Sequence, residues 1–191
     1  MKYRIGIYGG MGCGKSTVSD RLRRLGADVL DADKLNAELP ALPAYIAGVR
    51  ALCPACLAGG VFDKKALRRW VLESEENRQA LMALAHPMIR RIIEDRTREG
   101  LWFVEISVYT EGFIDFDESW HVVCAPEVQM ARILTRGGWS RAEAAKMIKA
   151  QGEEGLAPAD AVLLVNDGSL VDLEAQVDAL YEALRARLEE R

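Results

Sequence analysis

The sequence predicts an α/β fold: a parallel five-stranded β-sheet flanked by helices, with one helical insertion. Three observations support this prediction. Short apolar runs alternate with helix-forming segments along most of the chain. A glycine-rich turn follows the first apolar run and leads directly into a helix. The interval from about 34 to 99 contains helical segments but no convincing strand, which indicates an insertion at the carboxyl edge of the sheet.

Five apolar runs bounded by turn residues are expected to form the sheet. Their near-continuous apolar character is typical of parallel strands that are covered on both faces. Helices between the strands provide the crossovers, which are right-handed in sheets of this class. In chain order the runs are Arg4–Tyr8, Asp28–Asp31, Leu101–Ile106, His121–Ala125 and Asp160–Val165.

Seven segments have helical character. They are Ser16–Leu25, Ala66–Glu73, Glu75–Ala85, Pro87–Arg98, Pro126–Thr135, Arg141–Gln151 and Leu170–Arg191. Pro87 and Pro126 suit a first helical turn, where no backbone N–H is needed for the helix. Ser140 and Glu143 have the spacing of a capping box before the sixth segment.

Composition narrows the class of protein. The chain has 191 residues, half of them apolar, and a net charge of −4, which argues against general nucleic-acid binding. No apolar run approaches the roughly 18 residues of a membrane-spanning helix, and the first strand begins too early for a signal peptide. We therefore expect a cytoplasmic protein with no membrane partner, whose thiols stay reduced.

Two cysteines form a lone C-x-x-C pair at Cys53 and Cys56. Such a pair is half of a zinc site or a redox pair when a partner motif exists. Because the chain contains no second C-x-x-C or H-x-x-H, two small buried thiols are the preferred interpretation.

The glycine-rich turn carries the main chemical signal. Gly9–Ser16 matches G-x-x-x-x-G-K-[ST] between a strand and a helix, the arrangement of a P-loop NTPase of the kinase type. Glycines let successive N–H groups converge on an anion at a helix N-terminus. The predicted nucleotide-binding residues are Gly10, Met11, Gly12, Cys13, Gly14, Lys15, Ser16 and Thr17. Lys15 can reach the β- and γ-phosphates of a nucleoside polyphosphate, and the Ser16 hydroxyl suits Mg²⁺. A glycine-rich turn that binds nothing is the alternative.

Acidic residues follow two of the predicted strands. Asp31 and Asp33 close the second strand, and one of them is a candidate base for an alcohol acceptor. Glu105 ends the third strand, where a carboxylate can hold Mg²⁺ or a water bound to it, and Glu111 is a second acid near that edge. Helix capping by the aspartates and a solvent-facing strand end at Glu105 are the alternatives.

Arg132 and Arg136 lie one helical turn apart and precede Gly137 and Gly138. This spacing places both guanidinium groups on one helix face, as in a lid that brings charge to a transferring phosphoryl group. Ordinary surface arginines on an amphipathic helix are the alternative.

These features suggest one P-loop kinase domain over residues 1–191. Its core spans about 1–33, 100–135 and 152–191, with an insertion at about 34–99 and a lid at about 136–151. A basic cluster lies at the start of a helix in the insertion. It either neutralises the charge of a phosphorylated substrate or forms a solvated face. The cluster consists of Lys64, Lys65, Arg68 and Arg69.

The motifs together closely resemble the dephospho-coenzyme A kinases, along nearly the whole chain. The resemblance is carried by Ile5–Val18, Leu25–Ala27, Asp31–Asp33, Lys65–Arg68, His86–Ile89, Arg132, Arg136, Gln151, Ala159–Asp160 and Asn166–Ser169. It implies transfer of the ATP γ-phosphoryl to the ribose 3′-hydroxyl of dephospho-coenzyme A. It also implies a parallel-sheet core, a helical acceptor-binding domain and a small lid.

The resemblance further implies roles for individual residues. Asp33 would be the base, and Lys15 and Ser16 would hold the phosphates and Mg²⁺. Arg136 would close over the phosphoryl group, while Arg132 and Asn166 would bind ATP, with Asn166 near the adenine. The implied partners are ATP and dephospho-coenzyme A, and the implied assembly is a monomer or small homo-oligomer.

The chain departs from the family pattern mainly on the acceptor side. Tyr8 and Cys13 replace the usual Thr and Ser around the loop, Ala37 stands where an arginine is usual, and Ser107–Glu111 keeps only the acid of its motif. Two other hypotheses therefore remain. One is a kinase for a different small metabolite on the same scaffold, and the other is a nucleotide-binding regulator without transferase activity.

Overall fold

The computed structural model describes residues 2–107, 112–154 and 157–190. The chain divides into two compact units. The sheet unit comprises Met1–Asp31 and Thr97–Arg191, and the helical unit comprises Ala32–Arg96.

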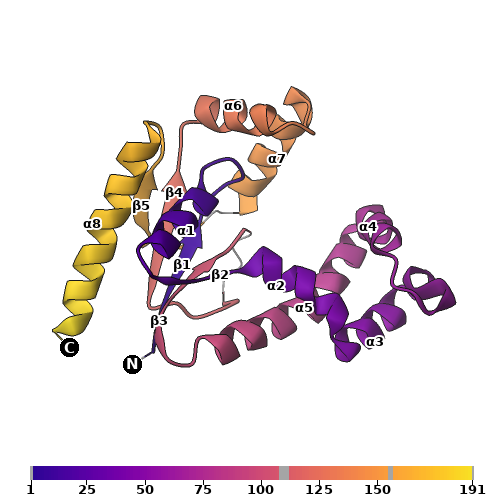
Figure 1. The fold of residues 1–191 in the computed structure, drawn as a ribbon. Helices are drawn as coiled ribbons and strands as arrows, with labels where there is room; N and C mark the ends of the chain where they lie inside the picture. Colours follow the sequence, from indigo (N-terminus) through magenta and orange to yellow (C-terminus); the bar gives the residue numbers. More distant parts are fainter. Residues whose placement is uncertain (1, 108–111, 155–156, 191) are drawn as a thin grey trace. The chain divides into compact units, whose positions relative to one another are not determined.

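The sheet unit contains five parallel strands within its described residues (Figure 1). They are β1 (Lys2–Tyr8), β2 (Asp28–Asp31), β3 (Gly100–Glu105), β4 (Glu118–Val123) and β5 (Val162–Val165). The strand order is β2-β3-β1-β4-β5, and every pairing is parallel. The order reverses beside β1, so the loop after β1 leaves the sheet at the point where α/β folds bind ligands. The predicted sheet is confirmed, with strand ends shifted by a few residues.

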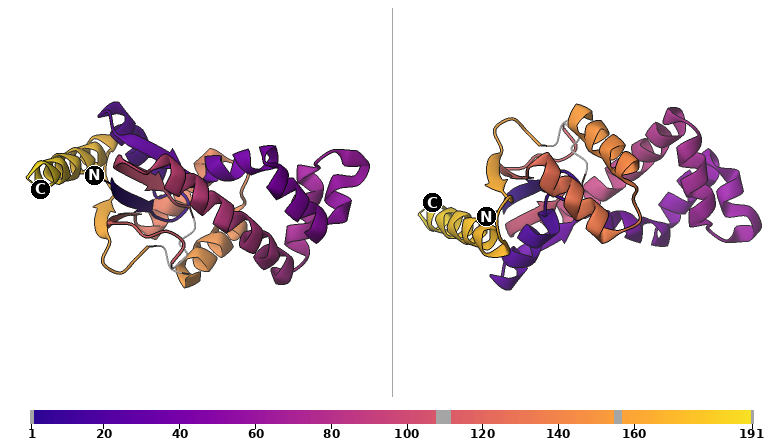
Figure 2. Two further views of the ribbon diagram at one scale, coloured as in Figure 1. Left: turned by 90° about the horizontal axis from the view of Figure 1, so that it is seen from below. Right: turned by 90° about the horizontal axis from the view of Figure 1, so that it is seen from above.

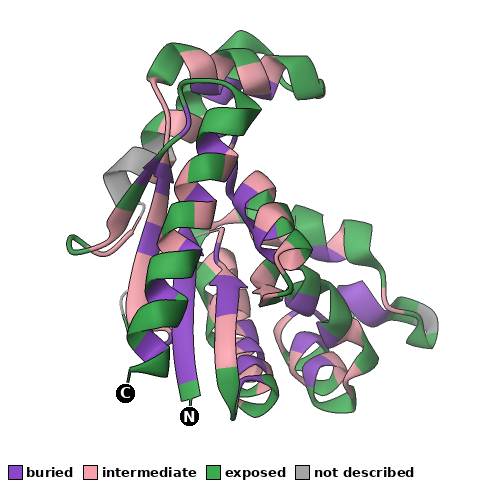
Figure 3. Ribbon diagram, turned by 60° about the vertical axis from the view of Figure 1, so that its left-hand side comes forward, coloured by how far each residue is buried: buried purple, intermediate pink, exposed green. Residues whose placement is uncertain are grey.

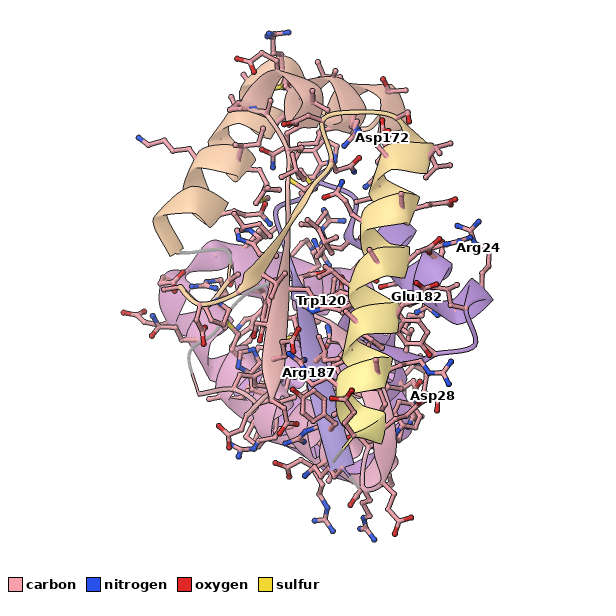
Figure 4. All side chains as sticks on the ribbon, turned by 90° about the vertical axis from the view of Figure 1, so that its left-hand side faces the viewer. Arg24, Asp28, Trp120, Asp172, Glu182 and Arg187 are labelled. Atoms are coloured by element: carbon pink, nitrogen blue, oxygen red, sulfur yellow. A yellow bond between two sulfur atoms is a disulfide. The ribbon has the colours of Figure 1, made fainter. Side chains whose placement is uncertain are left out.

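The described part of this unit also contains four helices: α1 (Lys15–Arg24), α6 (Pro126–Arg136), α7 (Arg141–Glu154) and α8 (Leu170–Glu189). α1 and α8 pack against each other and bury their apolar sides on one face of the sheet. Trp120 of β4 and Phe103 of β3 are fully buried there, and Trp120 is seen beside α8 in Figure 4. An aromatic centre of this size anchors both helices, because each large buried ring contributes on the order of 2–3 kcal/mol.

Burial differs between the centre and the edge of the sheet. β1 is buried along nearly its whole length, as Figure 3 shows, so both of its faces are covered. In β5, however, Leu163 and Val165 are 59% and 45% exposed. The backbone edge of β5 is protected at Val165, whose N–H and C=O both hydrogen-bond the Gln176 side chain of α8, at 2.9 and 2.8 Å. The expectation of strands covered on both faces therefore holds at the centre and is wrong at this edge.

Local signals at the helix ends have the predicted consequences. The Ser140 N–H donates to Glu143 Oε2 at 2.8 Å and the Glu143 N–H donates to Ser140 Oγ at 3.3 Å, so the capping box is formed. Pro126 occupies the first turn of α6, as expected. Gly137 and Gly138 separate α6 from α7 with φ of 75° and 79°.

The helical unit contains α2 (Ala32–Glu38), α3 (Pro43–Leu52), α4 (Lys64–Glu73) and α5 (Glu75–Arg96), with the 3₁₀ turns η1 (Leu39–Ala41) and η2 (Pro54–Gly60). α2, α3 and α4 all pack against α5, the long magenta helix in Figure 2. The described residues of the helical unit form no strand, as predicted, but the sequence did not predict α2 and α3.

α5 corrects one prediction. Two helices were expected on either side of His86, but Pro87 lies inside a single helix of 22 residues. An internal proline costs about 3 kcal/mol, because it removes a hydrogen bond and crowds the preceding turn. The buried stripe of Ala85, Ile89 and Ile93 continues across the proline at a spacing of four residues, and its burial offsets that cost.

The C-x-x-C pair corrects a second prediction. Cys53 and Cys56 are buried as expected, but they form a disulfide and are not two thiols. Cys53 is the C-cap of α3 and Cys56 lies in the first turn of η2, where the Cys56 N–H donates to the Cys53 carbonyl at 3.0 Å. This tight turn brings the two Cα atoms to 5.5 Å, a separation that a disulfide spans readily.

No helix among the described residues is both long enough and apolar enough to cross a membrane.

Candidate active site

The loop between β1 and α1 adopts the conformation that its glycines allow. Gly12 and Gly14 have φ of 84° and 105°, in the left-handed region that disfavours other residues. Space is equally restrictive, because a Cβ on Gly12 would lie 2.9 Å from Ile133 and one on Gly14 would lie 2.3 Å from Asn166 Nδ2. Gly14 is the N-cap of α1 and no side chain caps the helix there. The N-terminus of α1 is therefore available to an anion.

Lys15 is the first residue of α1 and is buried, with 9% of its surface exposed. Its Nζ donates a hydrogen bond to the Gly9 carbonyl oxygen at 2.7 Å. The ammonium group thus lies against the backbone at the start of the loop, where its charge can stabilise phosphate oxygens.

Cys13 and Asn166 join the loop to the end of β5. Asn166, the residue after β5, is buried and its Nδ2 donates to the Cys13 carbonyl oxygen at 2.7 Å. Asn166 in turn accepts two hydrogen bonds from Arg132: Nη1 donates to the Asn166 carbonyl at 3.0 Å and Nη2 donates to Oδ1 at 3.1 Å. This two-point contact fixes the plane of the Arg132 guanidinium group next to the loop.

A cavity of about 150 Å³ opens at this junction. It is lined by Gly12, Gly14, Thr17, Arg132, Arg136, Asn166 and Leu170. All but Leu170 were predicted nucleotide-binding or catalytic residues, and the fold brings them together from the loop, the first turn of α1, α6 and the residue after β5. The cavity is bordered by two cations and by glycine backbone, which suits a nucleotide.

Two free cysteines lie side by side behind the loop. Cys124 Sγ is 3.1 Å from Cys13 Sγ, and Cys13 is buried. Burial, together with the hydrogen bond to Cys13, raises the pKa of Cys124 to about 12. The Cys124 side chain therefore stays in the thiol form and packs as a small apolar group against Cys13.

Met11 is held by two glutamine side chains. Its N–H donates to Gln151 Oε1 at 2.9 Å, and its carbonyl accepts from Gln129 Nε2 at 2.9 Å. Gln129 was missed by the sequence reasoning, although it lies on α6 one turn before Arg132. Gln151 entered only through the resemblance, because a lone glutamine in a helix carries no local chemical signal.

The acidic side of the site lies where β2 and β3 end. Asp31 and Glu105 are register partners on these adjacent strands, and Glu105 Oε2 accepts a hydrogen bond from Ser19 Oγ at 2.7 Å. Burial raises the pKa of Glu105, the Ser19 hydroxyl opposes the rise, and the Asp31 carboxylate adds to it. A divalent cation would relieve the repulsion between these carboxylates.

The donors near this edge fit Mg²⁺. Ser16 is exposed in the first turn of α1, and Glu105 and Asp31 add hard carboxylate oxygens. No group of three or more His, Cys, Asp or Glu that could hold a metal occurs within the described ranges.

The remaining predicted residues lie elsewhere. Asp33 is in the first turn of α2, in the helical unit, two residues after β2 ends. The basic cluster occupies the first turns of α4, whose N-terminus is capped by Asp63 through the N–H groups of Lys65 and Ala66. Glu111, with the three residues before it, lies outside the described residues.

Comparison with known proteins identifies the family. The family model for dephospho-CoA kinase matches residues 3–172. The chain belongs to the dephospho-CoA kinase family. It is similar to the dephospho-CoA kinase of Symbiobacterium thermophilum, with 38% identity over 192 residues that cover 94% of this chain and 80% of that one. The dephospho-CoA kinase of Geobacter metallireducens is 35% identical, over 93% of this chain and 94% of that one.

Solved structures agree with the predicted fold. The crystal structure of TT1252 from Thermus thermophilus has a TM-score of 0.78 at 33% identity, covering 96% of this chain and 98% of that chain. Shikimate kinase from Acinetobacter baumannii has a TM-score of 0.58 at 13% identity, covering 98% of this chain and 95% of that chain, and shows likeness of fold alone. The predicted kinase-type fold and the predicted enzyme class, a phosphotransferase with an alcohol acceptor, are both confirmed.

Proposed function

We propose that this kinase transfers the γ-phosphoryl group of ATP to the ribose 3′-hydroxyl of dephospho-CoA, with Mg²⁺ as cofactor. The observation that carries the proposal is the phosphate loop itself. Lys15 lies buried at its mouth, 2.7 Å from the Gly9 carbonyl, beside the cavity lined by Arg132 and Arg136. Phosphoryl transfer depends mainly on positioning and on neutralising charge, and these residues supply both.

The phosphate end of ATP would be held by the loop. The glycine backbone of the loop, together with the α1 N-terminus, favours the phosphate oxygens, and Lys15 adds a full charge. Ser16 and Glu105 would hold Mg²⁺, which when bound neutralises charge on the β- and γ-phosphates.

The other end of ATP fits the 150 Å³ cavity. Arg132, fixed by Asn166, presents a flat cation on which a nucleobase can stack, and Leu170 supplies an apolar wall. Arg136, at the last turn of α6, is proposed to act on the transferring phosphoryl group when the 136–151 lid closes about Gly137 and Gly138.

Asp33 is proposed as the base that receives the proton of the acceptor hydroxyl. It lies at the first turn of α2, with its carboxylate near a helix N-terminus. The helical unit that it begins is proposed to bind the acceptor, with the cations of Lys64, Lys65 and Arg68 available to its phosphates.

The test is a mass-spectrometric search for coenzyme A after incubation with MgATP and dephospho-CoA. Lys15→Ala should abolish the product, because it removes phosphate charge stabilisation. Asp33→Asn should lower kcat by about a hundredfold or more and leave the Kd for ATP nearly unchanged.

Each alternative result has a distinct meaning. Coenzyme A made at a normal rate by Lys15→Ala would overturn the role of the loop. Strong loss of ATP binding in Asp33→Asn with kcat preserved would make Asp33 a nucleotide-site residue and not a base. ATP binding without coenzyme A would point to a different hydroxylated metabolite as acceptor.

A further inference from the structure

The peptide groups around Met11 are fixed from both sides by carboxamides. Gln151 Oε1 accepts the Met11 N–H and Gln129 Nε2 donates to the Met11 carbonyl, each at 2.9 Å. Gln129 is buried, and a Cβ on Gly10 would lie only 2.7 Å from its Nε2. The contact is therefore close and leaves the loop little freedom at this point.

The two glutamines come from different helices. Gln129 lies on α6 and Gln151 near the end of α7, and these helices pack against each other. The same hairpin carries Arg132 and Arg136. The two glutamine hydrogen bonds thus join the arginine-bearing hairpin to the phosphate loop at Met11.

Met11 needs such restraint because of its neighbours. It stands between Gly10 and Gly12, and Gly12 already has φ of 84°. A Gly-x-Gly segment has many accessible conformations, and ordering one residue costs about 1–2 kcal/mol. Because the two glutamines already order this segment in the folded protein, the free energy of ATP binding is not reduced by the cost of ordering it.

We propose that Gln151 and Gln129 are positioning residues that hold the Met11 peptides so that the following N–H groups of the loop converge on the nucleotide phosphates. They act through the loop and do not touch the transferred group. The proposal rests on the proposed function only in that the ligand is ATP. On the far limb of the loop, Asn166 binds the Cys13 carbonyl at 2.7 Å, so a carboxamide holds each limb.

The test is the Kd for ATP, measured by calorimetry without any acceptor. Gln151→Met keeps the length and shape of the side chain but removes the acceptor for the Met11 N–H. We expect about tenfold weaker ATP binding, an increase in the KM for ATP by the same factor, and an unchanged KM for dephospho-CoA. Gln79→Met is the matched control, because Gln79 is an exposed glutamine on α5 whose side chain donates to Glu75 Oε1 at 3.1 Å, and it should leave the Kd unchanged.

Two further variants keep the test decisive. Gln151→Asn retains a carboxamide that is one methylene too short to reach Met11, so it should weaken ATP binding as much as Gln151→Met. The double variant Gln129→Met/Gln151→Met should lose less than the product of the two single losses, because both act on one residue of the loop.

An unchanged Kd for ATP in Gln151→Met or Gln151→Asn would overturn the proposal, as would a lowered Tm with the Kd preserved, which is the signature of a merely structural contact. Losses that multiply fully in the double variant would overturn the shared action on Met11. Failure of the proposed function is distinguishable, because it would appear as absent coenzyme A while the Kd for ATP still responds to Gln151.

Discussion

Replacing Gly14 with alanine tests how closely the phosphate loop is packed against Asn166. Two separate costs are expected. The φ of 105° disfavours an L-residue by about 1–2 kcal/mol. The new Cβ would also lie 2.3 Å from Asn166 Nδ2, so the Asn166 carboxamide must move.

The cost of moving Asn166 follows from its hydrogen bonds. It would lose the bond to the Cys13 carbonyl, at 2.7 Å, and the bond from Arg132 Nη2, at 3.1 Å. At about 1 kcal/mol or more for each, Gly14→Ala should lower the free energy of unfolding by about 3–5 kcal/mol in total. For a chain of this size, each kcal/mol lowers the Tm by about 2–4 °C.

Gly26→Ala is the matched control. Gly26 has a similar φ of 83°, but a Cβ there would meet nothing within 4 Å, so only the backbone cost of about 1–2 kcal/mol applies. The assay is urea unfolding followed by tryptophan fluorescence, together with the Tm of each variant. In an Asn166→Ala background, which removes the carboxamide, the cost of Gly14→Ala should fall to that of Gly26→Ala.

The reasoning fails if Gly14→Ala and Gly26→Ala lower the free energy of unfolding by amounts that agree within about 0.5 kcal/mol, because contact with Asn166 would then add no measurable cost. It also fails if Asn166→Ala leaves the cost of Gly14→Ala unchanged.

Three other predictions concern the sheet unit. The pKa of Cys124 is about 12, so little of this thiol is in the reactive thiolate form at about pH 8. Its alkylation by iodoacetamide, followed by mass spectrometry, should therefore be roughly a thousandfold slower in the folded than in the unfolded protein. Rapid labelling of the native protein would contradict this. The hydrogen bonds from Arg21 hold the pKa of Asp178 below its ordinary value of 3.8, so Asp178→Asn should lower the free energy of unfolding at neutral pH. That difference should vanish as the pH falls through the lowered pKa, where wild-type Asp178 is also protonated; a difference that persists in acid would refute the ion pair. Ser169→Ala removes the capping box of α8 and should cost about 1 kcal/mol in urea unfolding, whereas no change would show that the cap is replaced by water.

Much of the sheet unit could be predicted because its signals are local. The glycines, Lys15 and Ser16 of the loop need only their neighbours to define a phosphate site, since φ preference and helix N-terminal chemistry act within a few residues. The capping box at Ser140 and Glu143 is local in the same way, and the structure contains it.

Predictions that depended on competing costs were less successful. Pro87 was expected to begin a helix, but burial of Ala85, Ile89 and Ile93 outweighs the penalty of an internal proline. The local sequence contains the penalty but not the burial, which depends on packing against α2, α3 and α4.

The motif sequence is enough to predict binding of nucleotide phosphates and to locate the start of the loop. It does not establish what holds the loop in shape. Asn166 lies 153 positions from Cys13 and Gln151 lies 140 positions from Met11, so their hydrogen bonds exist only after the sheet and the α6–α7 hairpin have assembled. A side-chain amide has no preferred partner within its own segment. It hydrogen-bonds to a backbone group that lies beside it in the folded structure and has no other partner there.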